Sequence, residues 1–191
     1  MPRKKRIWFP GAAYHITCRG NRQGDVYREK EDYWAYLSIL EEAQRKWGFI
    51  LYSYCLMTNH VHLQMETMEV DIGTIMRDIN LKYTKYFNNK YDVVGHLYQG
   101  RYRAEFITDD AYNLLVSRYI HLNPLKAGIV EWLLDYPWSS YDIYMGKRQS
   151  VLVDEYKILR YFNGYSRDLY RQYIDNGYLV PPGICRKGQV S

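Results

Sequence analysis

The chain contains 191 residues, 47% of them hydrophobic, and carries a formal net charge of +5. That length and apolar content suffice for one domain with a sizeable core, and no second domain is required. The three cysteines are widely spaced and form no C-x-x-C pair, which argues against a disulfide framework and a zinc knuckle. No apolar run of signal-peptide or membrane-spanning length follows the basic N-terminus. We therefore expect a reduced, cytoplasmic protein with no membrane partner.

Positive charge is concentrated in two segments of the chain. Residues 1–30 contain eight Lys or Arg against two acidic residues, and residues 82–103 contain five against Asp92 alone. Aromatic side chains such as Trp8 and Tyr102 accompany both segments. This mixture is typical of surfaces that bind single-stranded nucleic acid, although a charged run is more commonly a plain solvated face.

The first half of the chain predicts a strand, a helix and a hairpin. Residues 12–20 are typical of a strand that ends at a turn signal around Gly20. Residues 30–47 repeat apolar side chains at helical spacing, and Gly48 follows as a stop signal. Two further strands over 49–57 and 60–66 are expected to pair through a tight turn.

The second half continues the alternation of helices and strands. We expect a helix over 71–88, a strand near 101–107, and a helix that is capped at 108–110 and runs to about His121. Pro124 disfavours helical backbone in the residue before it, so this helix is expected to end by Asn123. The order β-α-β-β-α-β predicts an α+β, ferredoxin-like fold, in which helices cover one face of an antiparallel sheet and the other face is open for a ligand.

After residue 141 the sequence predicts a small helical tail. Two short amphipathic stretches, SVLVDEYKILRYF and SRDLYRQYIDNGY, lie in residues 142–191. Packing of this tail against the domain formed by residues 1–141 is the simplest interpretation.

The segment NHVHLQME places two of the chain's five histidines two residues apart in a strand. Side chains alternate along a strand, so His60 and His62 share a polar face while Val61 and Leu63 face the core. A bare His-x-His is more often an ordinary polar face of a sheet, but two imidazoles on one strand can also bind one metal ion.

The helix that ends near Pro124 carries Tyr119 and Asn123 four residues apart, hence on one face, whereas His121 points elsewhere. An amide oxygen at Asn123 could complete a metal site with the two histidines, and Tyr119 would then lie near the ion. Spacing alone favours the alternative in which Tyr119 is a core aromatic and Asn123 a C-cap.

Three segments, LMTNHVHLQM, GHLYQGRYRAEFI and YIHLNPLKAGIV, together resemble the single-tyrosine transposases of the HUH endonuclease superfamily, which is named for its His-hydrophobic-His motif. The layout with YIHLNP and PWSSY is more narrowly similar to the REP-associated tyrosine transposases. The likeness extends from about Tyr14 to Tyr141, about two-thirds of the chain.

The resemblance implies a metal held by the histidine pair and a helix-borne tyrosine that cuts single-stranded DNA. His60 and His62 match the metal-binding pair and Tyr119 matches the nucleophile. Asn123 occupies the position of a third ligand for which wider family members often use Gln. The implied cofactor is Mg²⁺ or Mn²⁺. Residues 1–141 would form the catalytic domain with a basic N-terminal arm.

The resemblance also implies a hairpin or single-stranded DNA substrate, a monomer rather than a dimer, and association with the nucleoid when DNA is bound. The side chains expected to contact DNA are those that dominate the two basic segments: Arg3, Lys4, Lys5, Arg6, Arg19, Arg101 and Arg103.

Two other functions fit parts of the sequence. A DNA-binding protein on the same fold that no longer cuts would not need His60, His62 and Tyr119 together. A metal-dependent hydrolase of small molecules would not need the basic segments. Strand cleavage of single-stranded DNA distinguishes all three.

Overall fold

The computed structural model describes residues 7–176 of the chain. Its centre is a four-stranded antiparallel sheet with the strand order β2-β3-β1-β4. The strands are β1 (Ala13–Arg19), β2 (Ile50–Met57), β3 (His60–Glu66) and β4 (Arg103–Phe106). β2 and β3 form the expected hairpin through Thr58 and Asn59, and the His-x-His strand β3 is one of the two inner strands.

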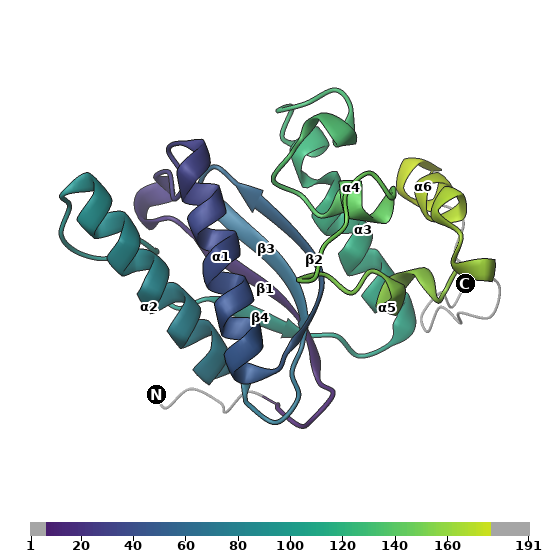
Figure 1. Ribbon diagram of the computed structural model, residues 1–191, viewed down its shortest axis with the longest axis horizontal. Helices are drawn as coiled ribbons and strands as arrows, with labels where there is room; N and C mark the ends of the chain where they lie inside the picture. The colour runs from purple at the N-terminus through teal and green to yellow at the C-terminus, as the bar shows by residue number, and fades with distance from the viewer. Residues whose placement is uncertain (1–6, 177–191) are drawn as a thin grey trace, which may run out of the picture.

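Two long helices, α1 (Lys30–Trp47) and α2 (Ile72–Tyr91), cover one face of the sheet (Figure 1). Local signals set their ends. Asp71 accepts hydrogen bonds from the first backbone N–H groups of α2, and Gly48 closes α1 in the left-handed region at φ +69°, which glycine adopts without strain. The ferredoxin-like α+β architecture predicted from the sequence is therefore confirmed.

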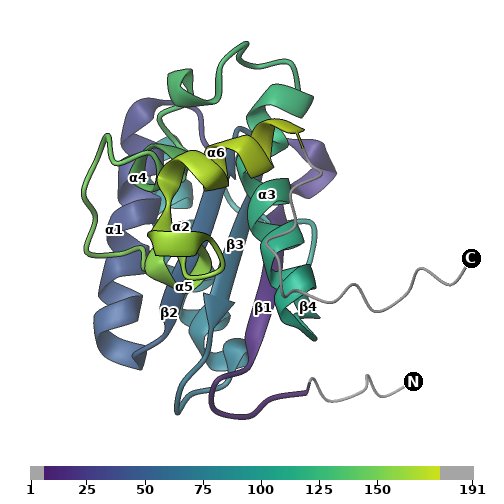
Figure 2. The same cartoon turned by 90° about the vertical axis from the view of Figure 1, so that its right-hand side faces the viewer.

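The opposite face is not entirely open. The helix α3 (Asp110–Lys126) packs against β2 and β3, and the short helices α4 (Tyr141–Tyr144), α5 (Tyr156–Leu159) and α6 (Arg167–Asn176) gather on the same side of the sheet (Figures 1 and 2). Short 3-10 turns at Asn21–Gln23, Leu133–Asp135 and Asn163–Tyr165 complete the connections. The part of this face over β1 and β4 is the part left for a ligand.

The helix α3 does not end before Pro124, as the sequence predicted, but continues through it to Lys126. Proline in the last turn removes one N–H donor, a cost that burial of Leu122 and Pro124 offsets. Beyond the helix, the N–H of Gly128 donates to the Leu125 carbonyl and the N–H of Ile129 donates to the Pro124 carbonyl, which terminates the last turn.

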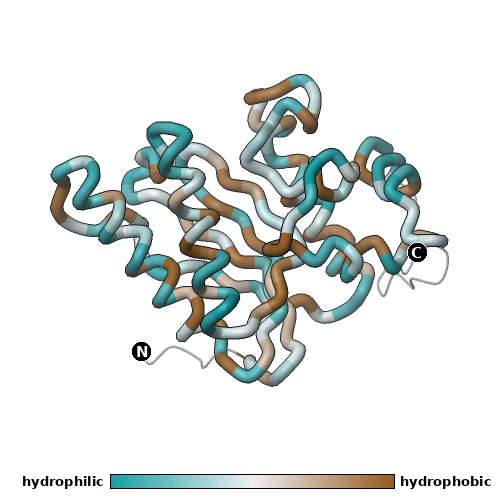
Figure 3. Tube along the Cα trace, in the orientation of Figure 1, coloured by the Kyte–Doolittle hydropathy of each residue, from teal (hydrophilic) through white to brown (hydrophobic). Residues whose placement is uncertain are grey.

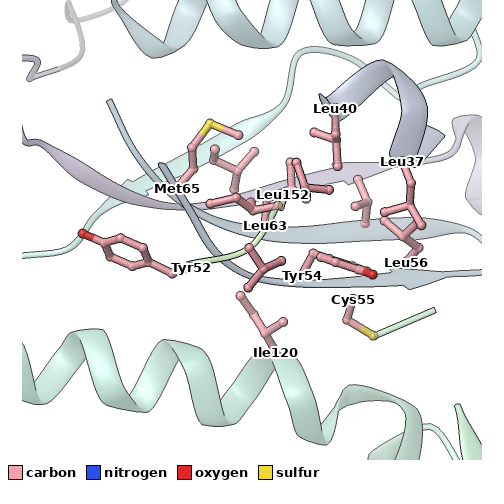
Figure 4. Packing of buried hydrophobic residues seen from close by; sticks show 14 of the residues in the cluster. Leu37, Leu40, Tyr52, Tyr54, Cys55, Leu56, Leu63, Met65, Ile120 and Leu152 are labelled. Atoms are coloured by element: carbon pink, nitrogen blue, oxygen red, sulfur yellow. The ribbon is translucent and has the colours of Figure 1, made fainter. Parts of the chain in front are cut away.

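The core lies on both sides of the sheet. Figure 4 shows Leu37 and Leu40 of α1 approaching the strands from one side and Ile120 of α3 from the other. Figure 3 shows hydrophobic stretches in the central strands and hydrophilic ones along the outer helices. None of the helices in residues 7–176 combines the length and apolar character needed to span a membrane.

The segment after α3 returns to the edge strand β2 and covers it. The N–H of Leu56 donates to the Trp138 carbonyl, and the N–H of Asp154 donates to the Leu51 carbonyl. These bonds satisfy backbone groups that would otherwise form an exposed sheet edge. The described part of the tail thus packs on the sheet. The division of the chain at residue 141 stays a prediction.

Candidate active site

A cleft of about 940 Å³ opens over β1 and β4, beside α3. The register of the sheet assembles its floor, because residues paired across antiparallel strands point to the same face. Thr17 of β1 lies between His62 of β3 and Arg103 of β4, and His15 lies beside Glu105. Tyr119 and Lys126 of α3 line the wall of the cleft.

His62 is 4% exposed, and its two ring nitrogens have different surroundings. Nδ1 lies 3.0 Å from Nε2 of His15 and 3.3 Å from Oγ1 of Thr17. Nε2 is buried and has no hydrogen-bond partner. Burial, with smaller contributions from His15 and His60, lowers the pKa of His62 to about 2, so the imidazole is neutral at physiological pH.

His60 precedes His62 on the same strand face. Its Nδ1 lies 2.6 Å from the side-chain oxygen of Asn59, which can only accept, so Nδ1 carries the proton and Nε2 carries the lone pair. The rings of His60 and His62 lie 4.9 Å apart. Burial, followed by the charge of Arg19, lowers the pKa of His60 to about 4.

These two histidines have the properties of a metal-binding pair. Both are neutral, both lie on one strand face, and His62 presents a buried nitrogen that no protein group satisfies. Such a nitrogen costs free energy unless a ligand reaches it. In residues 7–176, no three His, Cys, Asp or Glu side chains are grouped so that they could hold an ion together. A ligand of another type, such as an amide or water oxygen, would have to complete the shell.

Tyr119 lies over the histidines. Its ring centre is 5.3 Å from that of His62 and 5.6 Å from that of His15, edge to face in both pairs. The side chain is 42% exposed, so the phenol is accessible from the cleft. The amine of Lys126 lies 5.3 Å from the centre of the same ring. An accessible phenol next to neutral imidazoles and a cation is a suitable arrangement for nucleophilic attack on an anionic group.

Asn123 lies one turn beyond Tyr119 and is half-buried. Its side-chain N–H donates to the Tyr119 carbonyl at 2.7 Å, which turns the amide nitrogen back onto the helix. It does not line the cleft in this structure.

Three of the basic residues expected to contact DNA line the cleft, namely Arg19, Arg101 and Arg103. Arg118, which the sequence analysis missed, lines it too, but its guanidinium donates to the Tyr173 and Ile174 carbonyls at the end of α6. Four expected DNA contacts lie outside the described residues and stay predictions: Arg3, Lys4, Lys5 and Arg6.

Two buried polar connections hold α3, and therefore Tyr119, in place. The side-chain N–H of Gln64 donates to Asn113 at the start of α3, and Ser53 donates to the oxygen of Gln64. Deeper in the fold, His121 lies between the hydroxyls of Tyr170 and Ser140, at 2.7 and 2.8 Å. The sequence placed His121 away from Tyr119, and the structure confirms this.

Sequence analysis also missed His15, Thr17 and Glu105. A signal existed, because His15 and Thr17 alternate on one face of the first strand. In the ferredoxin-like order this strand lies beside the His-x-His strand, which brings that face to the same site.

Comparison with known proteins shows which family the sequence matches and which solved structures share the fold. The family model described as Transposase IS200 like matches residues 9–123. A Haemophilus influenzae protein named "Putative REP-associated tyrosine transposase" is 30% identical over 116 residues, which cover 54% of this chain and 65% of that protein. The match thus spans slightly less than two-thirds of the relative's length. A solved REP-associated tyrosine transposase, bound to a REP hairpin, shares the fold with a TM-score of 0.66 at 17% identity, covering 81% of this chain and 98% of that one.

Proposed function

We propose that this chain, which belongs to the family of IS200-like transposases, is a tyrosine endonuclease and strand transferase that acts on single-stranded DNA. The supporting observation is the approach of Tyr119 to His62, with 5.3 Å between their ring centres at the floor of a cleft lined by cations. An accessible nucleophile, neutral imidazoles with unused lone pairs and positive charge for a phosphate are the parts that this chemistry needs.

Mg²⁺ or Mn²⁺ is the proposed cofactor, held by Nε2 of His60 and of His62. Asn123 is the proposed third ligand. Its amide nitrogen donates to the Tyr119 carbonyl, so the side chain would have to turn into the cleft for Oδ1 to reach the ion. When bound, the ion would neutralise a non-bridging phosphate oxygen and fix the phosphorus for in-line attack. Imidazoles that stay neutral well below physiological pH keep their lone pairs available for this role.

Tyr119 is the proposed nucleophile. A phenol is protonated at neutral pH and has to lose its proton as the oxygen attacks phosphorus. As the bond from the tyrosine oxygen to phosphorus forms, the bond between phosphorus and the 3′ oxygen breaks. The 3′ oxygen takes up a proton to become a 3′-OH, and the other strand end is left as a 5′-phosphotyrosine. Because this intermediate conserves the energy of the phosphodiester, the 3′-OH of another strand can reverse the step and rejoin the DNA without ATP.

The proposed substrate is DNA that folds into a hairpin with a single-stranded flank. The solved relative is bound to a REP hairpin, and the cleft here is lined by Arg19, Arg101 and Arg103. These arginines would contact backbone phosphates, and the N-terminal residues Arg3 to Arg6 are proposed to add a further arm. The tyrosine lies beside histidines of its own chain, which supports a monomer that cuts in cis.

A cleavage assay tests the metal and the chemistry together. A pool of labelled hairpin oligonucleotides with randomised single-stranded flanks is incubated with the protein and Mg²⁺ or Mn²⁺, next to a fully paired pool. We expect cleavage of the hairpin pool alone and its loss in His62→Ala. His96→Ala is the matched control, because it removes an exposed imidazole that does not line the cleft. Cleavage by His62→Ala at the wild-type rate would contradict the metal assignment.

A further inference from the structure

Which ring nitrogen of His62 carries the proton decides whether Nε2 can bind a metal. A neutral imidazole has one N–H and one lone pair, so a metal at Nε2 requires the proton to be on Nδ1. The residues around Nδ1 therefore matter as much as the ligand itself. Metal-binding histidines are commonly fixed by a partner that accepts the second N–H, and loss of that partner weakens binding.

The partner of His62 comes from the neighbouring strand. Nε2 of His15 lies 3.0 Å from Nδ1 of His62, and the two rings stack with their centres 5.2 Å apart at 24°. One of these two nitrogens has to donate and the other to accept. If His15 donated, the proton of His62 would be on Nε2, where it would be a buried donor with no acceptor.

The other side of His15 decides between the two arrangements. Its Nδ1 lies 3.8 Å from a carboxylate oxygen of Glu105, the residue paired with it across β1 and β4. A carboxylate favours a proton on the nitrogen that faces it, which leaves Nε2 of His15 with the lone pair. Glu105 is itself held in place, since Arg103 donates to one of its oxygens at 2.6 Å and Tyr112 donates to the other at 3.3 Å.

We propose that His15, oriented by Glu105, is a positioning residue that fixes His62 in the tautomer with Nε2 open to the metal. The chain of contacts runs from the Glu105 carboxylate to His15, then to Nδ1 of His62. It gives His15 a role that the His-x-His motif does not include. His15 is not itself a ligand in this arrangement, because its lone pair accepts from His62. The inference rests on the proposed metal site.

Manganese binding by the full chain without DNA is the test, measured as the Kd for Mn²⁺ by electron paramagnetic resonance. We expect His15→Leu to raise the Kd by roughly 10- to 100-fold, the usual effect of losing such a partner. His15→Gln should restore most of the affinity, because its amide oxygen can accept from His62. Glu105→Ala should raise the Kd by less than His15→Leu. An unchanged Kd in Glu105→Ala would remove the carboxylate from the proposal.

A spectroscopic reading of the metal-free protein tests the tautomer directly. The ¹⁵N shifts of the His62 ring are expected to show the proton on Nδ1 in the wild type and in His15→Gln. A proton on Nε2 in the wild type would overturn the proposal, whatever the variants do. Because this measurement needs only folded wild-type protein, it holds even if His15→Leu folds poorly.

Two control variants separate the possible failures. Thr17→Val removes the other neighbour of Nδ1, 3.3 Å away. If Thr17→Val lost manganese affinity while both His15 variants bound like the wild type, threonine would be the partner and the proposal would be wrong. His62→Ala reports on the metal site itself. If His62→Ala bound Mn²⁺ as tightly as the wild type, the metal assignment and this inference would both fail.

Discussion

Acid should weaken the anchoring of the tail onto α3 through one residue, His121. This side chain is fully buried between Tyr170 and Ser140, and burial lowers its pKa to about 3. In the unfolded chain the same imidazole has an ordinary pKa near ~6.5. Below that pH, His121 binds a proton in the unfolded chain, whereas in the folded chain it stays unprotonated down to about pH 3. The contribution of His121 to stability is therefore complete above pH 6.5 and declines as the pH falls.

The size of the effect follows from proton linkage. Between the two pKa values, one proton of difference changes the free energy of unfolding by about 1.4 kcal/mol per pH unit. From pH 8 to pH 4.5, His121 alone should lower that free energy by roughly 3 kcal/mol. His62 and His60 are shifted in the same direction, so the wild type should lose more than this figure.

Urea unfolding at pH 8, 6.5, 5.5 and 4.5 measures this decline. His121→Gln removes the titrating group and keeps an amide that can both donate and accept. We expect it to be less stable than the wild type at pH 8 and to lose stability more slowly on acidification. His96→Gln, at an exposed position, should keep the wild-type slope. An identical pH slope in His121→Gln and the wild type would refute the reasoning.

Two further predictions concern DNA. If Arg101 and Arg103 each contact one phosphate, replacing either with Gln should reduce the slope of log affinity against log salt concentration for single-stranded DNA by roughly 0.7. Fluorescence anisotropy across a salt series measures this slope, and an unchanged slope would place that arginine outside the interface. If the tyrosine works with histidines of its own chain, a mixture of Tyr119→Phe and His62→Ala protein should not cleave DNA, because neither chain holds a complete site. Recovery of cleavage in the mixture would indicate that the tyrosine of one chain works with the histidines of another.

The sequence predicted the elements that depend on local patterns. The helix over 30–47 has an uninterrupted apolar repeat and a glycine stop, and the structure gives it the same bounds. The histidine strand alternates cleanly, and its apolar face is buried as expected. These features depend on periodicity within one segment, which the sequence contains in full.

The features that the sequence did not predict depend on contacts between distant segments. The helix passes through Pro124 because burial of Leu122 and Pro124 outweighs the local preference of proline. The partial cover of the second sheet face follows from contacts between α3 and the β2–β3 hairpin. The place of His15 and Glu105 at the site depends on strand register, which pairs them across β1 and β4 in the row beside the histidine pair. The sequence of one segment does not contain this register.

Whether Tyr119 forms a covalent bond to DNA is the most direct measurement. The wild type, Tyr119→Phe and the control Tyr156→Phe, which changes an exposed tyrosine that does not line the cleft, are incubated with 3′-labelled hairpin DNA and Mn²⁺, denatured, and separated on a gel. Tyr119→Phe removes one partly exposed oxygen, so the protein should still fold and bind DNA. We expect a slower-moving protein–DNA band for the wild type and Tyr156→Phe, and none for Tyr119→Phe. A band of wild-type intensity from Tyr119→Phe would show that another tyrosine is the nucleophile.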